Sequence, residues 1–360
     1  MKKNILLFSI LFVLNACDKP TDSVIKDDFD RKVMLQNYYD NLIFPAFTAL
    51  ESSVLVFETS LKLLVANPTE QTLSDAQKAW EATYIVWLSA NAYNFGPTGE
   101  DGIRKGLIEE IGTFPVNVAK IEANITTKKL TFNDFDRDNR GLLGIEYLLF
   151  DGDNKSALAK LKDQNRRNYL LALTENVKMW AIEAKKGWAG YKSDFTSKNG
   201  TDVGSSTSQL YNEFIRSYEA IKNFKMGLPL GLRAGQTQAE PSKVEGFYSK
   251  KSLKFLTANI NAIENIYYGR GTVDGLGLKE YLEAVEGGKT LVTSTEAQLA
   301  VIKTVLKTVP DSMPIAEQIV KSPQVLTALH TELQKNTRFF KSDMSSILGI
   351  AITFASGDGD

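Results

Sequence analysis

Residues 165–191 read NRRNYLLALTENVKMWAIEAKKGWAGY, and this stretch shows the pattern that decides the fold. Its apolar side chains at Leu170, Leu173 and Val177 recur every three or four residues. That spacing places them on one face of an α-helix. The stretch therefore predicts a long amphipathic helix with one buried face.

The same spacing of apolar residues covers most of the chain. Pro45 lies inside the first segment and is expected to kink or interrupt it, because proline lacks an amide N–H and its ring crowds the preceding turn. The segments predicted to be helical are 29–64, 72–93, 115–125, 134–150, 165–191, 208–224, 244–268, 278–285, 289–309 and 324–347.

This pattern predicts an all-α protein. No segment alternates apolar and polar residues for long enough to indicate a sheet, and 353–354 is the only possible strand fragment. A polar linker loop at 193–207 separates residues 28–192 from residues 208–360, and each part runs from long helices to a glycine-proline break. We interpret the parts as two helical-bundle-like halves packed together, although helices of similar pattern can also produce this likeness by chance.

The N-terminus has the pattern of a lipoprotein signal peptide. Two lysines precede an apolar run at 5–14, which is too short to cross a bilayer because a spanning helix needs about 20 apolar residues. The run ends in LNAC at 14–17, which matches the bacterial lipobox. We predict a signal peptide at 1–16, lipidation of Cys17, and a polar tether at 17–27 that holds the domain to the membrane of the cell envelope, in the outer membrane or facing the periplasm. An ordinary signal peptide with an accidental cysteine is the alternative.

Composition excludes several classes of site. Hydrophobic residues make up 43% of the chain and charged residues 24%, as is ordinary for a globular protein. Cys17 is the only cysteine, so the mature fold has no internal disulfide and no catalytic cysteine. His330 is the only histidine, which excludes a multi-histidine zinc site. The net charge is −1 and no basic stripe is present, so we expect no nucleic-acid partner.

The stretch RGLLGIEYLLF at 140–150 is apolar on nearly every face, which predicts a buried helix. Glu146 is its one acidic residue, and a buried carboxylate must be paired, protonated or metal-bound. A salt bridge or a helix cap would satisfy it, and contact with a ligand or metal is the functional alternative. We interpret the aspartates at 134–138 as charges that favour the N-terminal dipole of this helix, rather than as a calcium loop.

The same stretch resembles the imelysin family, whose pattern centres on Gly-x-His-x-x-Glu in an apolar helix that continues Tyr-Leu-Leu. Gly141, Glu146 and Tyr147 match, whereas Leu143 stands where the family has its histidine. The likeness covers residues 30–360. Its other parts, in the family's order, are Pro45, Trp80, Trp87, NFGP at 94–97, FPV at 114–116, RRNYL at 166–170, VEGFYS at 244–249 and the ending from LGI at 348–350 to DGD at 358–360.

The resemblance implies two helical halves with the motif helix near their interface, and an extracytoplasmic role in iron uptake. The family also carries a peptidase label, but the pair that could hold iron or another divalent metal lacks its histidine here, and Leu143 cannot coordinate a metal. We therefore expect a cell-envelope binding protein, with an iron species or an envelope protein as partner. A metallopeptidase and a non-catalytic interaction module with a degenerate site are the alternatives. The candidate ligand-binding residues are Glu146, also the candidate metal ligand, and Tyr147, Arg140, Glu245 and Arg233.

Overall fold

The computed structural model describes residues 28–100, 102–103 and 106–354, and every regular element among them is a helix. The predicted all-α class is therefore confirmed. The signal peptide, the lipidated Cys17 and the tether, all predicted within 1–27, lie outside the described residues.

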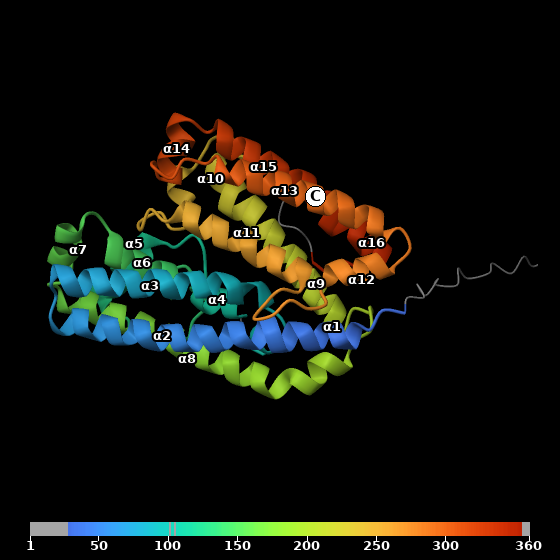
Figure 1. Ribbon diagram of the computed structural model, residues 1–360. Helices are drawn as coiled ribbons and strands as arrows, with labels where there is room; N and C mark the ends of the chain where they lie inside the picture. The colour runs from blue at the N-terminus through green and yellow to red at the C-terminus, as the bar shows by residue number, and fades with distance from the viewer. Residues whose placement is uncertain (1–27, 101, 104–105, 355–360) are drawn as a thin grey trace, which may run out of the picture.

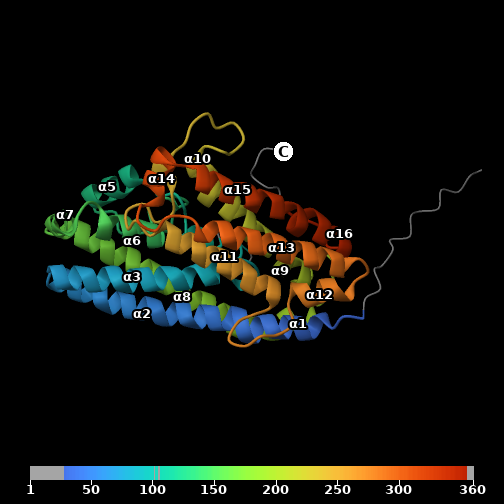
Figure 2. The same ribbon diagram turned by 45° about the horizontal axis from the view of Figure 1, so that its top comes forward.

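Three long helices form one side of the molecule: α2 (Phe44–Ala66), α3 (Glu70–Ala90) and α8 (Gln164–Ser197). Helix α2 packs against both α3 and α8, and the three run side by side in both views (Figures 1 and 2). The helix predicted at 165–191 is confirmed, and it extends to Ser197, so that only 198–205 of the predicted linker loop is irregular. The remaining helices of this side are α1 (Arg31–Asn37), α4 (Leu107–Ile111), α5 (Val118–Thr127), α6 (Gly141–Phe150) and α7 (Asn154–Lys160).

The second side follows α9 (Ser206–Ala220) and covers the first. Helix α11 (Ser252–Tyr268) packs against α3, whereas α13 (Gly288–Lys307) and α15 (Gln324–Thr337) pack on each other farther out (Figure 1). The other helices here are α10 (Leu228–Leu230), α12 (Leu278–Ala284), α14 (Ile315–Lys321) and α16 (Met344–Leu348). Short 3₁₀ turns, η2 (Asn91–Tyr93), η3 (Gly96–Thr98) and η5 (Pro241–Lys243), lie in the connections.

Three helices of the described chain contain π-helical segments, named η1 (Tyr38–Ile43), η4 (Ile221–Gly227) and η6 (Arg338–Asp343). The first lies directly before Pro45, so the expected interruption takes the form of a wide turn inside one continuous run from Arg31 to Ala66. By length and composition this run could cross a membrane, but its apolar face packs into the core of the protein, as Phe47 and Phe57 show. π-helical segments such as η1, η4 and η6 are frequent at functional sites.

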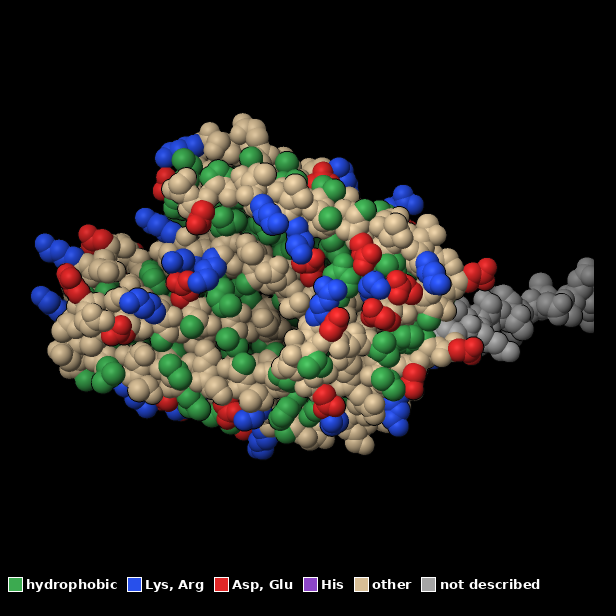
Figure 3. Space-filling view, viewed as in Figure 1, with side chains coloured by type: hydrophobic (Ala, Val, Ile, Leu, Met, Phe, Trp, Pro, Cys, Tyr) green, Lys and Arg blue, Asp and Glu red, His purple; other side chains and the backbone are tan. Residues whose placement is uncertain are grey.

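The surface carries charges of both signs. On the face drawn in Figure 3, Lys and Arg side chains are interspersed with Asp and Glu side chains, and apolar side chains lie between them. No single sign dominates this face.

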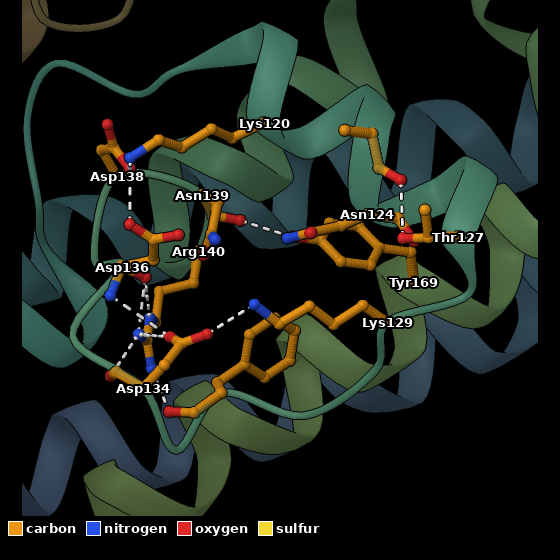
Figure 4. A network of polar contacts seen from close by, with 12 residues as sticks. Lys120, Asn124, Thr127, Lys129, Asp134, Asp136, Asp138, Asn139, Arg140 and Tyr169 are labelled. Atoms are coloured by element: carbon orange, nitrogen blue, oxygen red, sulfur yellow. Dashed lines mark hydrogen bonds and ion pairs between the residues drawn. The ribbon is translucent and has the colours of Figure 1, made fainter.

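The prediction of a helix from residue 134 was wrong, because α6 begins only at Gly141. The buried guanidinium of Arg140 explains the difference, since it binds the backbone carbonyls of Phe132, Asp134 and Asp136 and so holds the preceding chain in an open loop (Figure 4). These carbonyls are therefore not available for helical hydrogen bonds.

The aspartates of this loop do not cap α6, contrary to the prediction. The residue before the helix is Arg140, whose side chain makes no capping hydrogen bond. Asp134 pairs instead with Lys129 and Arg140, and Lys120 lies 3.0 Å from a carboxylate oxygen of Asp136 and of Asp138 (Figure 4). The acidic cluster thus ties the loop to itself and to α5.

The helix predicted from residue 244 was also placed too early. Residues 244–251 form a series of turns, and α11 starts at Ser252. Gly246 and Lys250 have φ angles of +73° and +59°, which a right-handed helix does not allow. This segment, called here the 244–251 turn, lies against the motif helix α6.

Candidate functional site

The motif helix α6 is buried over nearly its whole length. Leu143, which replaces the family histidine, is 2% exposed and belongs to the apolar core. Glu146 is equally buried, and its Oε1 accepts a hydrogen bond of 2.8 Å from the backbone N–H of Ser249. The carboxyl group is therefore satisfied by the 244–251 turn, and the alternative of a salt bridge to another helix does not apply.

The 244–251 turn owes its shape to Gly246. At its positive φ a side chain would be strained, and a Cβ there would come within 2.7 Å of the Phe255 ring. The turn places Glu245 on one side of Gly246 and Ser249 on the other. It thereby brings a second buried carboxyl group towards Glu146.

Glu245 is the centre of a buried polar network. Its Oε1 accepts a hydrogen bond of 2.7 Å from the Tyr84 hydroxyl and lies 2.9 Å from Nζ of Lys225. Its Oε2 accepts from Nδ2 of Asn259 at 2.9 Å. Lys225 also donates to Oδ1 of Asn259 at 2.8 Å, which closes the network. The residues come from α3, η4, the 244–251 turn and α11, so the network joins the two sides of the molecule.

Burial changes the ionisation of these groups. Removal from water, opposed by hydrogen bonds from Ser249 and reinforced by the charge of Glu245, raises the pKa of Glu146 to about 7. Burial and the negative charge of Glu245 also raise the pKa of Tyr84 far above its ordinary value. Tyr84 therefore stays a hydrogen-bond donor, and Glu146 titrates near neutral pH.

The other predicted site residues lie apart from this network. The Tyr147 hydroxyl donates to Oε1 of Glu122 at 2.5 Å, and Arg166 binds the same oxygen at 2.6 Å. Arg140 holds the loop before α6, as described above, and its Nη1 lies 3.3 Å from Glu110. The Arg233 guanidinium lies 4.3 Å from the centre of the Phe224 ring. The structure thus brings Glu146 and Glu245 together. Tyr147, Arg140 and Arg233 have their polar partners elsewhere, although the Tyr147 ring packs against Tyr248 of the 244–251 turn, with the ring centres 5.0 Å apart.

A cavity of about 400 Å³ opens beside Glu245, between the two sides of the molecule. Its volume lies in the range of small-molecule sites. One wall comes from the end of α3 and residues 91–100 and 108–114, and the other from α9, η4 and α11. Its charged lining residues are Glu100, Glu109, Glu213, Arg216, Lys225 and Glu245, and its apolar lining includes Trp87, Ile108, Phe114, Ile221, Phe224 and Ile263.

Sequence reasoning missed most of this cavity. Glu213 carried a usable signal, because it follows Leu210 by three residues and so shares the apolar face of the predicted helix with it. Lys225 and Tyr84 carried none, since their meeting with Glu245 depends on contacts between segments far apart in the chain.

The described residues do not fit the metal that the family motif implies. Within the part of the chain that the structure describes, no three Asp, Glu, His or Cys side chains converge to hold an ion. On α6 itself, Leu143 offers no lone pair, and Glu146 is engaged by the Ser249 amide. We derive no metal chemistry at this site.

Comparison with known proteins agrees with the fold and with the family resemblance. The chain is 22% identical to iron-regulated protein A of Synechococcus elongatus over 309 residues, which cover 82% of this chain and 80% of the relative. It superposes on the crystal structure of a protein assigned as an iron-regulated protein A precursor from Parabacteroides distasonis with a TM-score of 0.74 at 16% identity, covering 92% of this chain and 97% of the other.

A second crystal structure, of an imelysin-like protein from Psychrobacter arcticum, gives a TM-score of 0.72 at 16% identity and covers 92% of this chain and 100% of the other. The family model described as Peptidase_M75, Imelysin, matches residues 43–338, which is most of the chain. This protein therefore belongs to the imelysin family.

Proposed function

We propose that this protein is an exported, lipid-anchored binding protein of the cell envelope, which holds a ligand linked to iron uptake between its two sides. The observation that carries the proposal is the 400 Å³ cavity, whose walls come from both sides and include buried charged side chains. Burying charge is costly unless it is paired or serves a ligand.

The link to iron comes from the relatives, since two of them are named iron-regulated protein A. One of these names includes the word precursor, which agrees with export. The pattern at 1–17 supports lipidation of Cys17. Among the described residues no observation favours a peptidase, so binding remains the function that the geometry supports best.

The binding proposal is tested by thermal unfolding of the full-length protein, purified in detergent, with ferrous ion, ferric citrate, haem and zinc ion added separately. A ligand that binds the native state at 100 times its Kd stabilises it by about 2.7 kcal/mol and raises its Tm. We expect an iron species to raise the Tm, and expression of the protein to increase under iron starvation. If neither occurs, the proposed function is wrong.

A matched pair of variants locates the ligand. Ala220→Trp adds a large side chain at a half-buried position in the cavity wall, whereas Ala49→Trp adds it on the exposed face of α2. The first should abolish the Tm shift and the second should preserve it. An equal loss in both variants would contradict binding in the cavity.

The anchor needs its own test. Cys17→Ser should release the protein from the membrane fraction and remove the added mass of acyl chains. Unchanged membrane association would contradict lipidation, without affecting the cavity.

A further inference from the structure

Glu213 lines the cavity twelve residues before Lys225, the partner of Glu245, and its carboxyl group is incompletely satisfied. The residue is 3% exposed, and among the described residues its Oε1 has no hydrogen-bond partner. Its Oε2 lies 3.4 Å from Nη1 of Arg216. Arg216 is half exposed, and its guanidinium also lies 5.1 Å from the centre of the Phe354 ring, so that water and Phe354 share it. One oxygen of a buried carboxyl group thus remains for another donor.

Glu245, the other buried acidic residue described in this lining, has no such unsatisfied oxygen. Both oxygens of Glu245 are bound, by Tyr84, Lys225 and Asn259. Glu109 pairs with Arg137 at 2.9 Å outside the cavity. Among the described lining residues, Glu213 is therefore the buried acidic residue whose carboxyl group still has an oxygen, Oε1, free to accept a hydrogen bond.

The charge of the lining favours a cation over an anion. Among the described residues, the lining contains four acidic side chains, those of Glu100, Glu109, Glu213 and Glu245, and two cations, those of Arg216 and Lys225. Both cations already contact carboxylates of the lining. An anionic ligand would have to compete for cations that are already paired, whereas a cationic ligand can pair with Glu213 once that carboxyl group has lost its proton.

The apolar lining favours a ligand that has an apolar part besides its charged group. Trp87 and Phe114 come from one wall, and Phe224, with Ile221 and Ile263, from the other. Aromatic faces attract organic cations and bury apolar groups at the same time. A hydrated inorganic ion would use neither property.

We propose that this cavity binds a small organic cation, whose amine or amidine group donates to Oε1 of Glu213 and whose apolar part lies among the aromatic side chains. The inference rests on the proposed function in that it uses the same cavity, and it narrows the ligand there to a molecule that carries an amine or amidine group beside an apolar part, rather than a bare metal ion. It also explains why an acidic residue stands on the buried face of α9.

The ionisation of Glu213 gives the proposal a second readout. Burial, opposed by Arg216, raises the pKa of Glu213 to about 8. Without a bound cation, the Glu213 carboxyl group is therefore mostly protonated at neutral pH. A bound cation favours the ionised carboxylate and must release a proton. In the part of the chain that the structure describes, the other ionisable groups of this lining are Glu100, Glu109, Arg216, Lys225 and Glu245.

The experiment uses benzamidine as the cation, benzamide as its uncharged isostere and benzoate as the anion. Calorimetric titration of the full-length protein in detergent at pH 6, 7 and 8 should show binding of benzamidine alone. Its affinity should rise almost tenfold from pH 6 to 7 and less from pH 7 to 8. Near pH 7, buffers of different ionisation enthalpy should reveal release of close to one proton for each benzamidine bound.

The variants are Glu213→Gln, which retains the shape of the protonated acid, and Glu100→Gln at the exposed rim. The first should weaken benzamidine binding at least tenfold at pH 8 and remove its pH dependence, and the second should change it less than threefold. Equal binding of benzamide or benzoate, unchanged affinity in Glu213→Gln, no proton release, or no binding of benzamidine would each overturn the proposal. Proton release is measured on the unmodified protein, so it decides the question even if Glu213→Gln does not fold.

The two proposals fail separately. If an iron species raises the Tm and benzamidine does not bind, the cation site is wrong and the iron-linked binding role stands. If benzamidine binds with proton release, while no iron species raises the Tm and iron starvation leaves expression unchanged, the cation site stands and the iron-linked role is wrong.

Discussion

The backbone amide of Ser249 donates a hydrogen bond of 2.8 Å to Oε1 of Glu146, across 103 positions of the chain. This bond connects the motif helix to the 244–251 turn and so to the polar network around Glu245. The motif residue Glu146 is thus bound by a backbone donor from another segment. Leu143, one turn before it on α6, has no polar group that could bind it.

Glu146→Gln should change how stability depends on pH. The folded state raises the pKa of Glu146 from 4.5 to about 7, so its contribution is fully present below pH 4.5 and is lost as the pH rises through 7. The loss is on the order of 3 kcal/mol for this shift. Glutamine cannot ionise and can still accept from Ser249. In urea unfolding, we expect the variant to gain about that much relative to the unmodified protein between pH 4.5 and pH 8, and a constant difference would contradict the prediction.

Lys225→Met should destabilise the protein by about 3–5 kcal/mol, because it leaves the buried charge of Glu245 without its cation. The double variant Lys225→Met, Glu245→Gln should recover most of that loss. Lys303→Met is the control, because Lys303 pairs with Glu264 at a half-exposed position and should cost less than about 1 kcal/mol. Urea unfolding at pH 7.5 measures all three, and equal losses in the single variants would contradict a buried pair.

Gly246→Ala should disturb the turn that carries Glu245 and Ser249. A left-handed backbone costs an alanine roughly 1–2 kcal/mol, and the clash with Phe255 should add about 1–3 kcal/mol. Gly235→Ala separates the two effects, since Gly235 has a φ of +79° with no atom within 4 Å of the added Cβ. The difference in free energy of unfolding between the variants measures the clash, and identical values would show that Phe255 moves aside freely.

Arg140→Met should release the loop before α6 and leave Glu110 buried beside an apolar side chain. We expect a loss of about 3–5 kcal/mol. Limited trypsin digestion should cut faster at Lys128, Lys129 and Arg137, which lie in or next to that loop. Arg137→Met removes a more exposed ion pair with Glu109; it abolishes the cut at residue 137 itself, but should have little effect on stability or on cutting at Lys128 and Lys129. A protected loop in Arg140→Met would show that other contacts hold it.

Helical spacing was enough to predict the class and most helices, because an apolar face repeats every three or four residues whatever it packs against. The two largest errors, at 134–140 and 244–251, occur where one interaction overrides that pattern. Arg140 draws three carbonyls out of helical geometry, and Gly246 takes a left-handed conformation. The sequence contains both residues but does not show what they meet.

The candidate site was only partly predictable for the same reason. Glu146 and Glu245 were chosen as candidates, and the structure places them close together. Tyr84, Lys225 and Asn259 were missed, because an ordinary helical side chain becomes part of a site only through contacts from distant segments. The choice of Tyr147, Arg140 and Arg233 stays a prediction, and the structure gives each of them a local partner instead.

The π-helical segment Ile221–Gly227 makes chain length at this point a determinant of recognition. Each residue of an α-helix turns its successors by about 100°. Deletion of one residue in this segment would restore a regular helix, and would therefore change which side chains of the segment itself point towards the cavity, without changing their identity. Family members that differ by a single insertion or deletion here would present different side chains to Glu245. Their ligand preference would then diverge through helix register, which a comparison of aligned residue types alone would overlook.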